Sequence, residues 1–169
     1  LRLVNLMKLL RAEDAHVVFL ATEQPQHGRS LATLQASGIE VWQSPFSGRI
    51  PAWLAEHGPR FPVILASRHH LASTMIPLAR QYAPHARLVL DTIDLHYLRE
   101  SRAATLANDS ALEKSAERTR HMELGVINAS DVTLVVSQAE RELLAVDAPG
   151  ARVEVLSNLH EIAGPGLPY

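Results

Sequence analysis

The chain has 169 residues, of which 47% are hydrophobic and 20% charged, a composition typical of an ordinary globular domain. Its 16 basic and 18 acidic residues leave a formal charge of −2, so composition gives no general attraction to nucleic acid or anionic lipid. Cysteine is absent, which excludes a disulfide framework and a thiolate metal site. The sequence shows no signal peptide and no apolar run near the roughly 20 residues that cross a bilayer, and we therefore expect a cytoplasmic protein.

Short runs rich in Val, Leu and Ile alternate with helical patterns along the whole chain. The predicted helices are Leu1–Arg11, Ser30–Ser37, Ile50–His57, His69–Tyr82, two pieces between Leu95 and Ile127, and Ser137–Ala145. The predicted strands are His16–Ala21, Ile39–Gln43, Pro62–Ala66, Arg87–Leu90, Val132–Val136 and Val153–Leu156. Alternation at this spacing predicts an α/β fold: a Rossmann-like parallel sheet with right-handed crossovers and helices on both faces.

The two ends of the chain predict how it is organised. The chain begins inside a helical pattern, and in a βαβ series a helix follows a strand, so we expect a first strand to be missing. After the last predicted strand, Gly164-Pro-Gly-Leu-Pro168 has the composition of a linker. We therefore expect one domain over residues 1–158, with residues 159–169 leading towards a second domain that the chain lacks.

Polar side chains gather directly after the predicted strand Arg87–Leu90. They are Asp91, Asp94, His96, Arg99 and Glu100. In an open α/β sheet, ligands bind outside the carboxyl ends of the strands. An imidazole beside a carboxylate can transfer protons near neutral pH, which makes His96 and Asp94 candidate catalytic residues, although a lone histidine is more often a structural hydrogen-bonding group. A metal-binding pair of Asp91 and Asp94 is disfavoured, because their spacing in an extended segment sends the side chains to opposite faces.

A second polar group, Arg68, His69 and His70, follows the predicted strand Pro62–Ala66. The Arg68 guanidinium can grip a phosphate or carboxylate through two parallel hydrogen bonds. Adjacent histidines point to different sides of a helix, and no third ligand lies at a recognisable spacing, so the pattern favours exposed polar residues over a metal site. We expect no bound metal.

The long helical stretch after the first polar group carries one acidic residue on an apolar stripe. Asn108-Asp-Ser110 divides the stretch in two, and Ser110 with Glu113 has the form of a capping box. In the second piece Glu123 occupies a position where an apolar residue is expected. A buried acid needs a partner. Pairing with Arg120 one turn earlier, or with an Arg of another element, is the favoured interpretation, and orientation of a site residue such as Arg99 is the alternative.

A capping box of Ser137 and Glu140 follows the predicted strand Val132–Val136. Its ordinary role is to begin a helix. A helix start at the end of a strand also presents free N–H groups that can bind an anion or a sugar hydroxyl, so both roles stay open.

Three segments together resemble the N-terminal domain of GT-B glycosyltransferases, most closely the group 1, or family 4, enzymes. These segments are Leu90–Glu100, Glu123–Ser137 with Glu140, and Val153–Asn158. The resemblance implies two Rossmann-like domains facing a cleft, of which this chain is the acceptor side and the absent C-terminal domain holds a nucleotide-diphosphate sugar. Such enzymes usually need no metal. We expect no cofactor, and we expect the isolated fragment to be inactive. Glycolipid acceptors are common among them, which leaves open peripheral membrane contact of the full-length enzyme.

The resemblance also suggests roles for individual residues. A histidine after a mid-domain strand commonly lies near the reacting sugar in these enzymes; His96 is the closest match, and Asp94 is the alternative. The candidate substrate-binding residues are Arg68, Asp91, Arg99, Ser137, Glu140 and Asn158.

Two other classes of function remain. A nucleotide-sugar epimerase with the GT-B fold would share the architecture but act without an acceptor. A non-catalytic Rossmann-like binding or receiver module is the other alternative; a receiver would need a Lys near the last strand, and residues 132–156 contain none. Dinucleotide and P-loop motifs are absent from the chain, as is a Gly-x-Ser-x-Gly nucleophile elbow.

Overall fold

The computed structural model describes residues 2–22, 28–160 and 164, with the backbone alone for residues 28–30. The fold is α/β with parallel strands, as the alternation predicted. The strands form two sheets rather than one, and the chain divides into two compact units. One unit comprises Leu1–Trp53 and Asn158–Tyr169, and the other comprises Leu54–Ser157.

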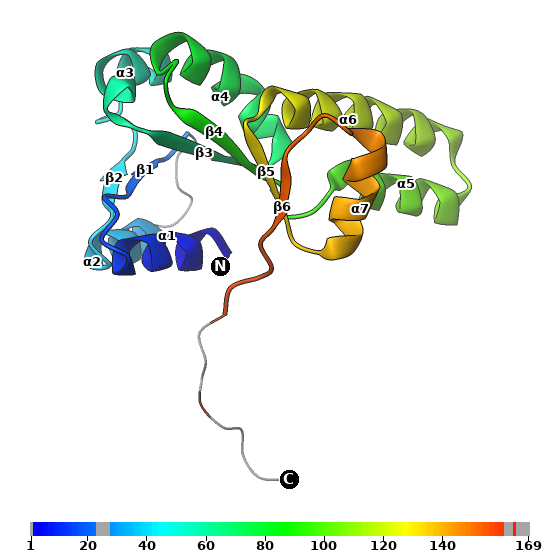
Figure 1. Cartoon of the computed structure of the whole chain (residues 1–169), viewed down its shortest axis with the longest axis horizontal. Helices are drawn as coiled ribbons and strands as arrows, with labels where there is room; N and C mark the ends of the chain where they lie inside the picture. The colour runs from blue at the N-terminus through cyan, green and yellow to red at the C-terminus, as the bar shows by residue number, and fades with distance from the viewer. Residues whose placement is uncertain (1, 23–27, 161–163, 165–169) are drawn as a thin grey trace. The chain divides into compact units, whose positions relative to one another are not determined.

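The first unit contains a two-stranded parallel sheet and two helices that pack on it. Its elements are α1 (Arg2–Ala12), β1 (Val18–Leu20), α2 (Gly28–Ala36) and β2 (Glu40–Trp42), and α3 (Ile50–His57) leads into the second unit (Figure 1). Met7, Leu31, Leu34 and Ile39 form its buried core. The Asn5 side chain donates a hydrogen bond of 2.7 Å to the carbonyl of Leu159, which attaches the start of the predicted linker to α1.

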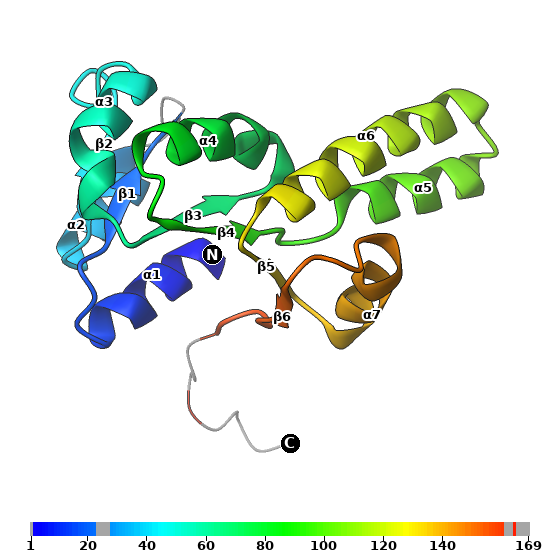
Figure 2. The same cartoon turned by 45° about the horizontal axis from the view of Figure 1, so that its top comes forward.

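The second unit contains a four-stranded sheet with the order β3-β4-β5-β6. After a short 3₁₀ helix (Gly58–Arg60), its elements are β3 (Val63–Ser67), α4 (His69–Tyr82), β4 (Arg87–Asp91), α5 (His96–Ala107), α6 (Ser110–Ala129), β5 (Val132–Val135), α7 (Gln138–Asp147) and β6 (Val153–Val155). Each pair of neighbouring strands is parallel and is joined by at least one helix (Figures 1 and 2). The carboxyl ends of all four strands therefore lie at the same edge of the sheet, the edge where ligands bind in open α/β folds.

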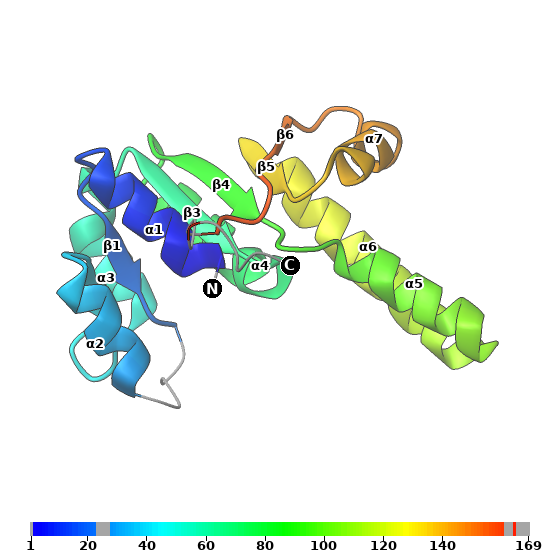
Figure 3. The same ribbon diagram turned by 90° about the horizontal axis from the view of Figure 1, so that it is seen from below.

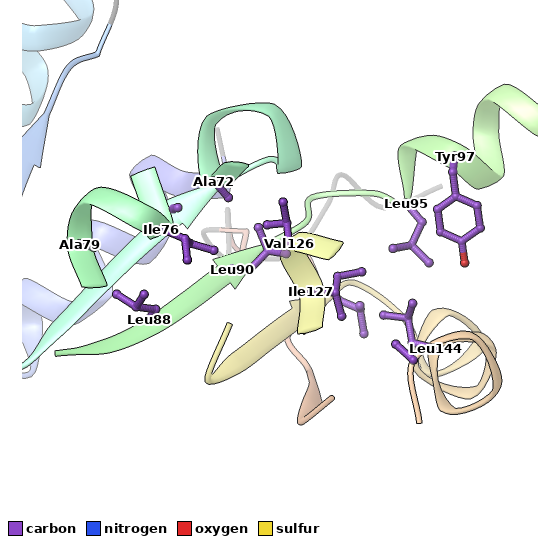
Figure 4. Close-up of a cluster of buried hydrophobic side chains, with 13 residues drawn as sticks. Ala72, Ile76, Ala79, Leu88, Leu90, Leu95, Tyr97, Val126, Ile127 and Leu144 are labelled. Atoms are coloured by element: carbon purple, nitrogen blue, oxygen red, sulfur yellow. The ribbon is translucent and has the colours of Figure 1, made fainter. Parts of the chain in front are cut away.

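The core of this unit lies between the sheet and helices α4, α6 and α7. Leu88 and Leu90 from β4 contribute apolar side chains, α6 contributes Ile127 and α7 contributes Leu144 (Figure 4). All four side chains are at most 2% exposed. Burying a leucine or isoleucine stabilises a fold by about 1.5–3 kcal/mol, so this cluster fixes β4 and the residues that follow it.

Helices α5 and α6 pack side by side as an antiparallel pair, joined by a tight turn (Figure 3). Asn108 ends α5 in the left-handed conformation, at φ 49°. Asp109, not the predicted Ser110, caps α6, because its carboxylate accepts hydrogen bonds from the backbone N–H groups of Ala111 and Leu112. Within the part of the chain that the structure describes, no helix has the length and apolar character needed to cross a membrane.

Candidate functional site

The backbone is strained at the two strand ends where the sequence placed polar clusters. Arg68 follows β3 at φ 73° and ψ 144°, and Ile93 lies between β4 and α5 at φ 67°. Both are conformations that residues other than glycine rarely adopt, least of all a β-branched isoleucine. The Arg68 N–H donates to the carbonyl of Asp91 at 2.9 Å, which ties one strand end to the other. Such strain persists only where the surrounding structure imposes it, and it concentrates at functional sites.

Glu123 lies at the centre of this region. It projects from α6 and is completely buried. One carboxylate oxygen accepts the N–H of His96 at 3.3 Å and the other accepts the N–H of Tyr97 at 3.0 Å. These N–H groups belong to the first turn of α5, whose own N-cap residue, Leu95, offers no side-chain hydrogen bond. An acid from a different helix therefore caps α5 and fixes where that helix begins.

Both predicted partners of Glu123 lie elsewhere. Arg120 forms ion pairs with Asp147 at 2.9 Å and with Glu117 at 3.7 Å, and Arg99 forms an ion pair with Asp94. The prediction that Glu123 pairs with Arg120 is wrong. Arg120 is one turn away along α6, but the helix turns its guanidinium towards α7, while the Glu123 carboxylate turns towards the start of α5.

Two imidazoles lie over the Glu123 carboxylate. His69 is the first residue of α4 and His96 the first residue of α5. Their Nδ1 atoms lie 3.7 Å and 4.0 Å from Oε1 of Glu123, and their ring centroids are 4.7 Å apart in an edge-to-face arrangement. The expectation of exposed histidines at this helix start is wrong for His69, which is only 8% exposed, and holds for His70.

Asp94 and Arg99 line the more exposed side of the same cluster. The Asp94 carboxylate lies 3.3 Å from Nδ1 of His96, and the Arg99 guanidinium binds Asp94. The His96 side chain is 15% exposed, so it can be reached from solvent while it is held on two sides. A carboxylate at this distance favours one orientation of the imidazole, which is the arrangement that proton transfer requires.

Burial and neighbouring charges shift the pKa values of Glu123 and His69. Burial raises the pKa of Glu123 to about 7, opposed by the hydrogen bonds from Tyr97 and His96 and supported by the nearby carboxylates of Asp94 and Glu100. Burial also lowers the pKa of His69, and the neighbouring imidazoles act in the same direction. Nδ1 of His69 and Oε2 of Glu100 are buried without a hydrogen-bond partner. The cluster thus combines unsatisfied polar atoms with a carboxyl group that titrates near neutral pH.

Hydrogen bonds from Tyr97 and Arg120 to Asp147 also hold the start of α5 in place. The Tyr97 hydroxyl donates to one oxygen of Asp147 at 2.7 Å, and Arg120 donates to the other at 2.9 Å. The hydrogen bond from Tyr97, followed by the hydrogen bond and the positive charge of Arg120, lowers the pKa of Asp147. Since Tyr97 is the residue after His96, these hydrogen bonds to Asp147 also fix where the His96 imidazole lies relative to α6 and α7.

The remaining candidate residues occupy varied positions. Arg68 is exposed at the end of β3, whereas Asp91 is completely buried at the end of β4. The Ser137 hydroxyl accepts the N–H of Glu140, as the predicted capping box requires, but the Glu140 carboxylate accepts the N–H of Val136, one residue before the cap, so the capping box is formed only in part. Asn158 is exposed and belongs to the first unit, whereas the strand-end cluster belongs to the second.

A cavity of about 360 Å³ lies at the amino ends of the strands, away from this cluster. It is lined by Arg80, Pro84, His85, Ala86, Arg87, Asp131 and Arg152. Arg80 pairs with Asp131 at 2.8 Å and Arg152 with Glu154 at 3.2 Å. Two of the cavity's arginines are thus engaged in ion pairs. We place the candidate site at the carboxyl ends instead, because ligands bind there in open α/β folds.

Sequence reasoning found part of this site and missed part. It identified His96, Asp94 and Arg99 from their place after a strand, and it singled out Glu123 as an acid on an apolar stripe. It did not place His69 or Glu123 beside His96, because no local spacing relates residues on three different helices. Comparisons of the chain with protein-family models, curated proteins and solved structures found no match.

Proposed function

We propose that this chain forms the acceptor-side domain of a GT-B glycosyltransferase, which transfers a sugar from a nucleotide-diphosphate sugar to a carbohydrate or glycolipid acceptor. One observation carries the proposal: a partly exposed imidazole, His96, is held beside a carboxylate at the carboxyl end of a strand in a parallel sheet. Because a fold of this class hosts many activities, the proposal rests on this site and on the resemblance of the segments around it, not on the fold alone.

The chemistry of sugar transfer suits the residues present. The transition state carries positive charge on the sugar ring and negative charge on the departing diphosphate. In the proposal His96 contacts the acceptor and the reacting sugar, Asp94 orients His96, and the exposed Arg68 and Arg99 supply cationic hydrogen-bond donors around the cleft. The nucleotide would be bound mainly by a second domain.

The direct test is turnover by the natural polypeptide that contains this chain. It is incubated with a panel of nucleotide-diphosphate sugars, with and without oligosaccharide and glycolipid acceptors, and released nucleoside diphosphate is measured. The proposal predicts release that depends on an acceptor. Epimerised nucleotide sugar formed without any acceptor would contradict it and favour an epimerase.

A further inference from the structure

Three side chains with metal-binding donor atoms converge at the carboxyl ends of β3 and β4. They are His69 at the start of α4, His96 at the start of α5 and Glu123 from the middle of α6, and their donor atoms all lie within 4.8 Å of one another. We propose that His69, His96 and Glu123 bind a divalent transition-metal ion of the zinc class. Two imidazoles and one carboxylate are a common ligand set for such ions, with further coordination positions left for water or substrate.

The distances between donor atoms are close to those of a metal site. In a tetrahedral zinc site with bonds of about 2.0–2.1 Å, neighbouring donor atoms are about 3.3 Å apart. Nδ1 of His69 is 3.7 Å from Oε1 of Glu123, and Nδ1 of His96 is 4.0 Å from the same oxygen. Each distance exceeds that separation by less than about 1 Å, which is within reach of small side-chain rotations. For His96, the rotation would move Nδ1 from the Asp94 carboxylate, 3.3 Å away, to the metal ion.

Unsatisfied polar atoms support a bound cation at this position. Nδ1 of His69 is buried and makes no hydrogen bond, and a buried polar group without a partner costs about 1–3 kcal/mol. A metal ion would satisfy that nitrogen directly. Glu123 can serve as a ligand while it caps α5, because each carboxylate oxygen has two lone pairs and each accepts one backbone N–H.

The charges around the cluster also favour a cation. Asp94 and Glu100 lie close enough to raise the pKa of Glu123, and Oε2 of Glu100 is buried without a hydrogen-bond partner. Arg99 is already paired with Asp94. A divalent ion would offset these carboxylates, and Glu100, one turn beyond His96 on α5, is placed as a further ligand or as a partner for a metal-bound water. The two imidazoles favour Zn²⁺ or Co²⁺ over Mg²⁺ or Ca²⁺, which prefer oxygen ligands.

The sequence disfavoured a metal site at His69 and His70, and the structure removes the reason for that. His69 and His70 lacked a third ligand at a recognisable spacing, and adjacent histidines cannot share one metal ion on a helix. The structure separates the pair: His69 is buried beside Glu123, and His70 is exposed. The partners of His69 come from α5 and α6, so no sequence spacing reveals them. The inference does not rest on the proposed sugar transfer, and it replaces the expectation that the chain binds no metal.

Metal titration of the chain tests the site without any knowledge of its substrate. The chain is treated with a chelator, dialysed, and titrated with Zn²⁺ by calorimetry and with Co²⁺ by visible absorption at slightly alkaline pH, where imidazole is neutral. We expect one ion per chain, a Kd of about 1 μM or lower, and Co²⁺ absorption bands typical of low-coordinate nitrogen and oxygen ligation. Zn²⁺ should also raise the thermal unfolding temperature, because it binds the folded state. Mg²⁺ should bind at least about a hundredfold more weakly.

Variants assign the binding to these residues. His69→Ala and Glu123→Gln should each weaken Zn²⁺ binding by about a hundredfold or more, with far-UV circular dichroism to confirm folding. His96→Ala removes the remaining ligand. Its Zn²⁺ affinity tests the site if His69→Ala or Glu123→Gln fails to fold. His70→Ala is the matched control, since it removes an exposed imidazole from the adjacent position. The proposal would be overturned if Zn²⁺ and Co²⁺ showed no saturable binding. It would also be overturned if folded ligand variants bound as well as the native chain, or if His70→Ala lost as much binding as they do. The cluster would then be metal-free and proton-sharing.

Discussion

At the scale of single residues, Glu123 joins the start of α5 to the two imidazoles of the site. Its carboxylate caps α5 through two backbone N–H groups and lies within 4.0 Å of both histidines. A buried acid at an apolar position is costly unless its oxygens are satisfied. Here both oxygens are satisfied by the start of another helix, so Glu123 has a structural role whatever chemistry the histidines perform.

Replacing Glu123 with Gln should destabilise the chain by about 1–3 kcal/mol, because the amide nitrogen cannot accept a hydrogen bond and leaves one N–H of α5 unsatisfied. Urea unfolding measures the change. Glu117→Gln is the control on the same helix; Glu117 is exposed, and its loss should change stability by less than about 0.5 kcal/mol. Equal effects of the two substitutions would show that Glu123 does not cap α5.

Asp147 gives the chain a predictable sensitivity to acid. Its pKa is lowered in the folded state, chiefly by the hydrogen bond from Tyr97 and then by Arg120. Its contribution is therefore complete above the unfolded-state pKa of about 3.9 and is lost as the pH falls through the lower folded-state pKa. We expect Asp147→Asn to be about 1–3 kcal/mol less stable than the native chain at neutral pH, with a difference that shrinks below about pH 4. Urea unfolding at several pH values measures this difference; one that stays constant down to about pH 2 would contradict the assignment.

At the scale of elements, the sequence located nearly every helix and strand of the described residues, because periodic apolar patterns and short Val/Leu/Ile runs are local signals. For example, the predicted strand Arg87–Leu90 is observed as Arg87–Asp91, and the predicted helix His69–Tyr82 is observed with the same bounds. The predicted start at Leu1 lies outside the described residues. The cap at the start of α5 has no local sequence signal, because it comes from Glu123, 27 residues further along the chain than His96.

The turn between α5 and α6 allows two cap assignments to be compared directly. Asp109 accepts two backbone N–H groups, so Asp109→Ala should destabilise the chain by about 0.5–2 kcal/mol. Ser110→Ala should change stability by less than about 0.5 kcal/mol, because alanine suits the first turn of a helix. Urea unfolding of both variants checks the assignment, and a larger loss from Ser110→Ala would restore the cap that the sequence suggested.

At the scale of the whole molecule, the α/β class and the parallel pairing follow from alternation, whereas the division into two sheets and two units does not. The general location of the site was also predictable, because parallel strands place their carboxyl ends at one edge. Its composition was not. His69 looked like an exposed residue at a helix start, and only the packing of α4 against α6 brings it to Glu123 and His96. The strain at Arg68 and Ile93 lies in the same region and had no signal in the sequence.

The most direct test of the proposed function is acceptor-dependent release of nucleoside diphosphate by the natural polypeptide, compared with its His96→Ala variant. A group that takes part in proton transfer contributes about 10²–10⁴-fold, so we expect turnover to fall by at least about a hundredfold while the domain stays folded. His85→Ala is the control, since His85 is an exposed imidazole at the amino ends of the strands and should leave turnover unchanged. Undiminished turnover in a folded His96→Ala variant would contradict the account.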